Sequence, residues 1–137
     1  MMYKFLIPLL FVIFFMGCQS AVILDHLVGI YYLVAADDDR QCSLATHEPS
    51  DGGTYGNVVN QTVFAVGYNE KYIIAKQHPD NNRKITNYFI VPMEQHITRE
   101  NLNNILGPLT YNQFMTKRHE LIIPDSLHFT KEYEDLK

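Results

Sequence analysis

The first hydrophobic stretch of the chain is an uninterrupted apolar run, Phe5–Met16. A single positive charge, Lys4, precedes this run, and Gly17 and Cys18 follow it. Twelve apolar residues are too few to cross a hydrocarbon core of roughly 30 Å as a helix, which takes about 20 residues. A short apolar run behind a positive charge is instead typical of a cleavable export signal. We therefore predict that residues 1–17 are a signal peptide.

Residues Phe15–Cys18 read Phe-Met-Gly-Cys, the layout of a bacterial lipobox. Gly17 gives the peptidase access to the backbone, and the Cys18 thiol is the acceptor for a diacylglyceryl group. Cleavage between these two residues would leave a lipidated cysteine at the start of the mature protein. The match departs from the usual pattern at Phe15, where an aliphatic residue is the norm. Two alternatives stay open: a plain secretory signal with a chance cysteine, and an uncleaved anchor continuing through residues 21–24, which polar and charged neighbours interrupt.

Beyond the leader, runs rich in β-branched and aromatic residues alternate with polar turns, a pattern that predicts short strands. Leu27–Ala36 is the first predicted strand, the acidic turn Asp37–Arg40 ends it, and Gln41–His47 is the second. The carboxylates of this turn are consecutive and lack the spacing of a calcium loop, so we interpret it as a solvated turn. Glu48–Gly56 is a predicted loop because of its Pro and Gly content.

The clearest pattern is an antiparallel meander. Thr62–Asn69 and Lys71–His78 are predicted strands, and Tyr68–Lys71 supplies a tight reversal between them. Ile85–Val91 is the third strand of the meander, and Pro92 ends it. Alternation predicts that one face of the second of these strands carries Tyr72, Ile74 and Lys76.

Two helices are predicted near the C-terminus. Thr98 is a suitable N-cap for the first, which ends at Gly107. Thr110 and Gln113 have the spacing of a capping box for the second helix, and Phe114 begins its apolar stripe. The predicted apolar face of the first helix consists of Leu102, Ile105 and Leu106.

These elements predict a single α+β domain, an antiparallel β-meander sheet with two C-terminal α-helices packed on it. We place the domain at residues 27–130. Residues 18–26 are predicted to be a short lipidated tether, and residues 131–137 a charged tail that frays.

The net negative charge argues against nucleic acid as a partner and against adsorption to an anionic membrane, so we expect the lipid to provide the membrane anchor. The chain carries a net charge of −4, and removal of Lys4 with the leader leaves ten basic and fifteen acidic residues, a net charge of −5. No basic stripe is present, so nucleic acid is not an expected partner. With Cys18 lipidated, Cys42 is the remaining cysteine of the mature chain, so no intramolecular disulfide is expected there. We expect Cys42 to be a buried, unreactive thiol.

The sequence contains no recognisable catalytic motif. The histidines have no metal-ligand spacing, and no Gly-x-Ser-x-Gly elbow occurs. We therefore expect no enzyme activity, no cofactor and no metal site. The histidines in question are His26, His47, His78, His96, His119 and His128.

Nine tyrosines make a binding surface the more plausible functional feature. Tyrosine is enriched at interface hot spots, although half-buried sheet positions also favour it. The tyrosines that we single out as a possible interaction surface are Tyr31, Tyr32, Tyr68, Tyr72 and Tyr88.

Three segments together resemble a known family: Tyr31–Arg40, Thr62–Gln77 and Ile85–Val91. The family comprises small uncharacterised bacterial proteins with a domain of unknown function, often Bacteroides-type lipoproteins. Phe114–Phe129 also fits, so the resemblance covers most of the mature chain. It implies no activity and no catalytic residue.

The expected role is therefore that of a lipid-anchored cell-envelope protein, held on the membrane through its N-terminal lipid and serving as an accessory or interaction module for an envelope protein. Gln19, and not Asp, follows Cys18, which favours the outer membrane, facing the periplasm. The alternatives are a small-ligand binder or small hydrolase with a pocket between sheet and helices, and an envelope protein without a specific ligand.

Overall fold

The computed structural model describes residues 23–137. The predicted signal peptide, its cleavage site at Gly17 and Cys18, and the first residues of the predicted tether lie outside the described residues and stay predictions.

The first of two antiparallel sheets is a meander of four strands in the order β1-β2-β3-β4. Its outer strands are β1 and β4, and each connection joins neighbouring strands. The strands are β1 (Ile23–Val28), β2 (Tyr31–Ala35), β3 (Ser43–His47) and β4 (Tyr55–Val59).

The second sheet has five strands in the order β8-β7-β6-β5-β9. Strands β5 to β8 form a second meander, and the C-terminal strand β9 adds to the free edge of β5. The strands are β5 (Val63–Tyr68), β6 (Tyr72–Gln77), β7 (Asn87–Pro92), β8 (Leu106–Leu109) and β9 (Lys131–Glu132).

Helix is a minor component. α1 (Arg99–Leu102) is a single turn, and α2 (Tyr111–Glu120) is the one long helix among the described residues. None of the helices in residues 23–137 has the length and apolar content needed to cross a membrane. Short 3-10 turns occupy Asp39–Gln41, Pro49–Asp51, Pro79–Asn81 and Glu134–Leu136.

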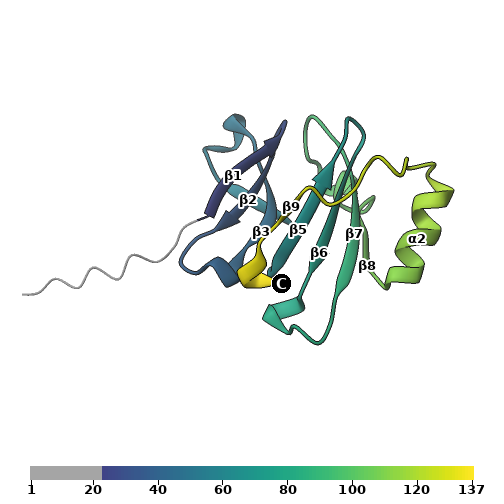
Figure 1. Cartoon of the computed structure of the whole chain (residues 1–137). Helices are drawn as coiled ribbons and strands as arrows, with labels where there is room; N and C mark the ends of the chain where they lie inside the picture. Colours follow the sequence, from purple (N-terminus) through teal and green to yellow (C-terminus); the bar gives the residue numbers. More distant parts are fainter. Residues whose placement is uncertain (1–22) are drawn as a thin grey trace, which may run out of the picture.

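The elements stack in three layers, with the first sheet, the second sheet and α2 following one another across the molecule (Figure 1). Apolar side chains from both sheets form the larger core; Tyr31, Leu33, Ile73 and Val91 are among its members. A smaller core between the second sheet and α2 consists of Ile74, Ile90, Phe114, Ile123 and Leu127. Ile73 and Ile74 enter different cores, which confirms the alternation predicted for β6.

Cys42 lies in the larger core and is fully buried. Burial raises the pKa of its thiol to about 12, so the thiolate that would react with other molecules is scarce at neutral pH. The prediction of a buried cysteine is confirmed.

The α+β class is confirmed, with strands as the main component. The single predicted sheet is in fact two. The run Leu27–Ala36, predicted as one strand, bends into a hairpin at Gly29, whose φ of +54° reverses the chain and pairs Val28 with Tyr31. Glycine adopts this left-handed backbone at little cost. The reversal turns one predicted strand into the β1–β2 pair and adds a strand to the first sheet.

The first predicted helix is wrong beyond its opening turn. Thr98 does cap it, but α1 ends at Leu102 and is followed by two asparagines, which are weak helix formers. Leu106–Leu109 instead forms edge strand β8 on β7, where the missing N–H of Pro108 is tolerated. Ile105 packs on the larger core and Leu106 on the smaller one, so they do not share a helix face.

The predicted domain, residues 27–130, is too short at both ends. β1 begins at Ile23, so residues 23–26 belong to the sheet and not to the tether. The predicted frayed tail is wrong, because β9 pairs with β5 and Leu136 is only 1% exposed in the larger core. Lys131 also forms an ion pair with Asp25 of β1. The segment was predicted to fray because most of its residues are charged, although it also contains the apolar side chains that pack on the core.

Gly67 in β5 allows the C-terminal segment to cross close to the second sheet. A Cβ atom added there would overlap the carbonyl oxygen of His128. We expect Gly67→Ala to lower the free energy of unfolding by about 1–3 kcal/mol, the usual cost of overpacking. Gly56→Ala in β4 is the matched control, since its added Cβ would lie 3.9 Å from the Thr46 hydroxyl oxygen, an ordinary contact. Urea unfolding of both variants measures the difference, and equal midpoints would contradict this close crossing.

Candidate functional site: a groove at one end of the second sheet

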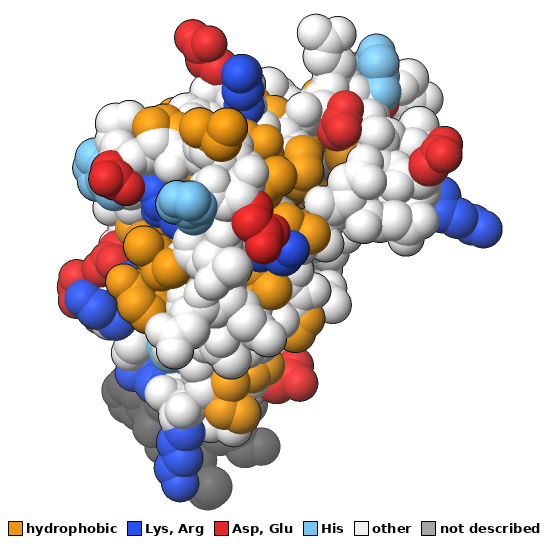
Figure 2. All heavy atoms as spheres, turned by 90° about the vertical axis from the view of Figure 1, so that its right-hand side faces the viewer, with side chains coloured by type: hydrophobic (Ala, Val, Ile, Leu, Met, Phe, Trp, Pro, Cys, Tyr) orange, Lys and Arg blue, Asp and Glu red, His pale blue; other side chains and the backbone are white. Residues whose placement is uncertain are grey.

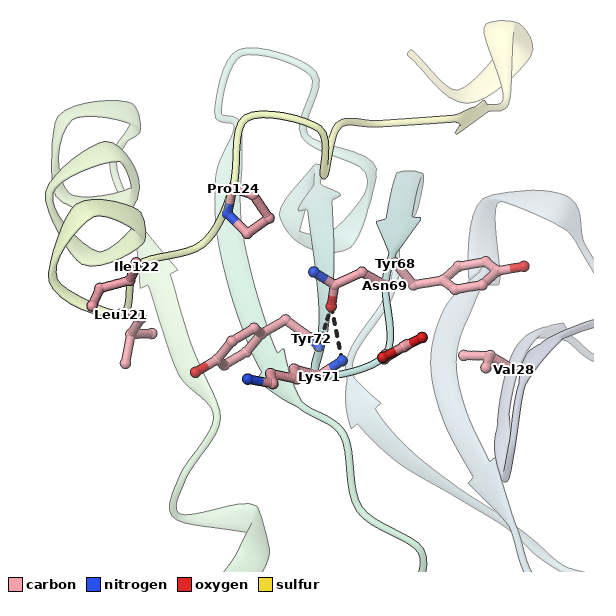
Figure 3. Close-up of a pocket in the computed structure, with 9 residues that line it drawn as sticks. Val28, Tyr68, Asn69, Lys71, Tyr72, Leu121, Ile122 and Pro124 are labelled. Atoms are coloured by element: carbon pink, nitrogen blue, oxygen red, sulfur yellow. Dashed lines mark hydrogen bonds between the residues drawn. The ribbon is translucent and has the colours of Figure 1, made fainter.

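An open groove of about 810 Å³ lies in the described part of the chain. Three segments border it: the end of β1, the β5–β6 turn, and the stretch that follows α2 (Figure 3). Its lining residues are Val28, Tyr68, Asn69, Glu70, Lys71, Tyr72, Leu121, Ile122 and Pro124. The groove therefore joins elements from all three layers.

The floor of the groove is the reversal predicted from the sequence. The backbone N–H of Asn69 donates to the carbonyl of Tyr72 at 3.0 Å, which closes the turn. The Asn69 side-chain oxygen accepts from the backbone N–H groups of Lys71 at 2.8 Å and Tyr72 at 2.9 Å (Figure 3). These bonds fix the turn, while the side chains of Glu70 and Lys71 are exposed and have no ion-pair partner within residues 23–137.

Two tyrosines flank this turn and point in opposite directions. The Tyr68 ring extends toward Val28 of the first sheet, and the Tyr72 ring extends toward Leu121 and Ile122 (Figure 3). Tyr68 is 43% exposed and Tyr72 is half-buried at the border of the smaller core. Neither hydroxyl has a hydrogen-bond partner among the described residues. The two rings thus supply apolar surface together with free donors and acceptors.

The third side of the groove follows the C-terminus of α2. The helix ends in a Schellman arrangement, in which the N–H of Ile122 donates to the carbonyl of His119 at 3.1 Å and that of Ile123 to the carbonyl of Arg118 at 2.9 Å. The position after the C-cap Leu121 normally carries glycine because its backbone is left-handed. Here Ile122 occupies it with a φ of +54°.

Ile122 is unusual both in the solvent exposure of its side chain and in its backbone conformation. Its side chain is 87% exposed, whereas the next residue, Ile123, is buried in the smaller core. A β-branched residue in the left-handed region is strained, and strained residues cluster at functional sites. Neither fold stability nor packing explains an isoleucine here.

Arg118 holds the segment after α2 in position. Its buried guanidinium donates to the carbonyl of Pro124 at 2.9 Å and to the carbonyl of Leu127 at 2.7 Å, and it lies 5.5 Å from the Phe114 ring centroid. The groove wall is therefore fixed to the helix by charge-assisted hydrogen bonds. On the face that carries α2, patches of hydrophobic side chains are open to solvent, with charged side chains at their borders (Figure 2).

The five predicted surface tyrosines do not form one surface. Tyr68 and Tyr72 come together at the groove. Tyr32 lies on the outer face of the first sheet, and Tyr88 packs against Phe114 beneath α2.

The choice of Tyr31 as a surface residue is wrong. It is fully buried; its hydroxyl donates to the Pro92 carbonyl at 3.3 Å and accepts from the N–H of Glu94 at 3.0 Å. Burial raises the pKa of this phenol. Tyr31 is adjacent to Tyr32 on a strand, so the two must face opposite sides of the sheet.

The histidines and the acidic turn do not build a metal site in residues 23–137, where no group of three potential ligands comes together. His78 is buried, stacks on Phe64, and hydrogen-bonds the Ile85 carbonyl at 2.8 Å. Asp38 of the acidic turn pairs with Arg40, which lowers the pKa of that carboxyl. His78 and Asp38 thus each have a structural partner, while the Nε2 atom of His78 is buried without a hydrogen-bond partner among the described residues.

The sequence reasoning singled out Tyr68 and Tyr72 and missed the other lining residues, among them Val28, Leu121, Ile122 and Pro124. One signal was available for Ile122: the apolar run Leu121–Ile123 continues past the end of α2, where a glycine is the usual residue. For Val28 there was no signal, because its place at the groove depends on how the two sheets meet.

One comparison places the chain among known proteins. The family described as "Protein of unknown function (DUF3997)" matches residues 28–135. No curated protein and no solved structure matches the chain. The match confirms the expected domain of unknown function, while bacterial origin and lipoprotein type stay predictions.

Proposed function

The chain belongs to the family of proteins of unknown function DUF3997, and we propose that this member is a lipid-anchored cell-envelope protein that acts as a protein-interaction module. Cys18 is its anchor and the groove is its binding site. The observation that carries the proposal is Ile122, an apolar side chain 87% exposed on a strained backbone beside an apolar groove. A residue that costs stability and packs on nothing is explained if a partner covers it.

The groove favours a partner segment of a particular chemistry. Val28, Leu121 and Ile122 offer apolar contacts, and the free hydroxyls of Tyr68 and Tyr72 offer hydrogen bonds within the same site. Tyrosine combines these two properties at many protein interfaces. The expected partner is an envelope protein that presents an apolar segment with free backbone or side-chain polar groups.

In this proposal, the lipid on Cys18 determines where in the cell the protein is located. Each buried methylene contributes about 0.8 kcal/mol, so one acyl chain binds a membrane weakly and two or three bind it stably. Gln19 after the cysteine supports the outer membrane, facing the periplasm. We expect Cys18→Ala to remove the lipid, seen as a mass difference, and to move the protein out of the membrane fraction. Full membrane retention of this variant would refute the anchor.

Replacing Ile122 with glycine is expected to stabilise the domain. The left-handed backbone costs an isoleucine about 1–2 kcal/mol, and the greater flexibility of unfolded glycine returns about 0.5–1 kcal/mol of that. The free energy of unfolding should rise by about 0.5–1 kcal/mol in urea titrations. A loss of stability would show that Ile122 is held by contacts within the domain.

The same variant tests the interaction. Lipidated wild-type protein and Ile122→Gly are each used to capture partners from native envelope, with Met115→Ala as the control for an exposed apolar side chain outside the groove. The proposal predicts that one stoichiometric partner is recovered with wild type and control and falls at least tenfold with Ile122→Gly. Equal recovery with all three proteins would contradict a role for the groove.

A second candidate function is binding of a small apolar ligand, which the volume of the groove favours, since ligand pockets usually measure about 300–1,000 Å³. Hydrolysis has less support, because the lining contains no Ser, Thr, Cys or His. Native mass spectrometry of the purified protein separates the two functions. A bound small molecule that Ile122→Gly releases supports this second candidate.

A further inference from the structure

The outer face of the first sheet is free of charged side chains. Burial alternates along β2, and the pairing register of β1, β3 and β4 assigns their residues to the same two faces, so that one set points away from the larger core. Two members of this set, Ser43 and Ala45, are themselves buried. No member of the set is Lys, Arg, Asp or Glu, in a chain with 19% charged residues. We call this set the outer sheet face; it consists of Leu24, His26, Tyr32, Val34, Ser43, Ala45, His47, Tyr55 and Asn57.

Aromatic rings dominate the outer sheet face. Tyr32 is at the centre, with ring-centroid distances of 4.7 Å to His26, 5.6 Å to Tyr55 and 6.0 Å to His47. Leu24 is 59% exposed and Tyr55 is 39% exposed. The charge on β1 points elsewhere, because Asp25 pairs with Lys131 on the inner side. A cluster of amphipathic rings with exposed apolar side chains, and without Lys, Arg, Asp or Glu, is typical of residues that meet a membrane–water interface.

The sequence places this face close to the proposed anchor. Only residues 19–22 separate Cys18 from Ile23, where β1 begins. A fully extended chain covers about 3.3–3.6 Å per residue, so Ile23 lies within roughly 18 Å of a lipidated Cys18. Leu24 and His26 belong to the strand that follows directly. Among the described strands, β1 is the one joined to the anchor by the shortest stretch of chain.

We propose that the outer sheet face rests on the lipid surface, with Leu24 and Val34 in contact with the headgroup–acyl boundary and the tyrosines at headgroup level. This inference depends on the lipid anchor of the proposed function. Tethering raises the effective concentration of the face at the bilayer, so a few apolar contacts suffice. The acidic residues Asp37 and Asp39 border β2 and favour zwitterionic over anionic lipid.

This orientation has a consequence for the groove. The first sheet and α2 are the two outer layers of the molecule (Figure 1). A first sheet that faces the membrane turns α2 away from it. The segment after α2, with Ile122, then faces the aqueous side, where an envelope partner can reach it.

Labelling of lipidated protein in phosphatidylcholine vesicles tests the inference. One variant carries an environment-sensitive fluorophore on Val34→Cys, in the outer sheet face, and the other on Met115→Cys, on α2. Buried Cys42 is not expected to react in the folded protein. We expect spin-labelled lipids to quench the fluorophore at position 34 at least threefold more than that at position 115. Adding Leu24→Glu should reduce the quenching at position 34.

The outcomes separate this inference from the anchor. Intact mass measured first reports the lipid on Cys18, and an unmodified thiol overturns the proposed address. With the lipid present, equal quenching at both positions overturns the membrane contact alone. Protection of position 34 in native envelope without quenching in vesicles also overturns it, and assigns the outer sheet face to a protein or glycan.

Discussion

Leu136→Ala is expected to lower the free energy of unfolding by about 2–5 kcal/mol, although the residue is next to the end of the chain. Leu136 is 1% exposed and belongs to the core between the two sheets. Truncating a buried leucine removes its transfer free energy and leaves a cavity, which together account for this range. Chemical unfolding followed by circular dichroism measures the change.

Lys137→Ala is the matched control for Leu136. Lys137 forms exposed ion pairs with Glu132, 3.1 Å away, and Glu134, 3.8 Å away. Pairs of this kind contribute no more than about 1 kcal/mol. A small and equal change in both variants would mean that the C-terminal segment does not pack as part of the core.

Arg118→Ala is expected to cost about 2–4 kcal/mol of stability and to loosen one wall of the groove. The substitution removes the donors to the carbonyls of Pro124 and Leu127. A buried acceptor without a partner costs about 1–3 kcal/mol. The contact with the Phe114 ring is also lost. Both the unfolding free energy and amide hydrogen exchange in residues 121–127 should report the change.

Lys117→Ala is the control on the same helix, because Lys117 pairs with Glu120 at the surface. It should change stability by less than about 1 kcal/mol and leave hydrogen exchange in residues 121–127 unaltered. If Arg118→Ala gave the same exchange pattern as this control, the arginine would not be what positions the groove wall.

Local chemistry predicted several elements correctly. The β5–β6 hairpin follows from two runs of strand-forming residues on either side of Asn69-Glu70, and its turn closes as expected. The capping box of Thr110 and Gln113 is present at the start of α2. In each case the residues that decide the structure lie within a few positions of one another.

Features that depend on distant contacts were not predictable. β8 is a strand because β7 offers it an open edge, and β9 is ordered because β5 and Asp25 lie beside it. Asp25 and Lys131 are far apart in the sequence, and neither residue reveals the other. The second sheet could not be separated from the first by pattern alone, since strands of both sheets have the same alternation.

The site was predictable in part for the same reason. Tyr68 and Tyr72 flank a turn that the sequence specifies, so both could be placed near each other. Whether they are exposed depends on what α2 and β1 leave uncovered. Tyr31 shows this limit most clearly. It is the same residue type as its neighbour Tyr32, and it is buried only because its side of the strand faces the core.

Site-specific photo-crosslinking in the native envelope tests the central claim most directly. A photoreactive phenylalanine analogue replaces Tyr68 in the groove or Tyr111 on α2, two exposed tyrosines on the same domain. The account predicts that position 68 yields one discrete crosslinked protein, and that Ile122→Gly removes this product while position 111 yields none. Equal crosslinking at both positions, or a product at position 68 that persists with Ile122→Gly, would contradict the groove as the interaction site.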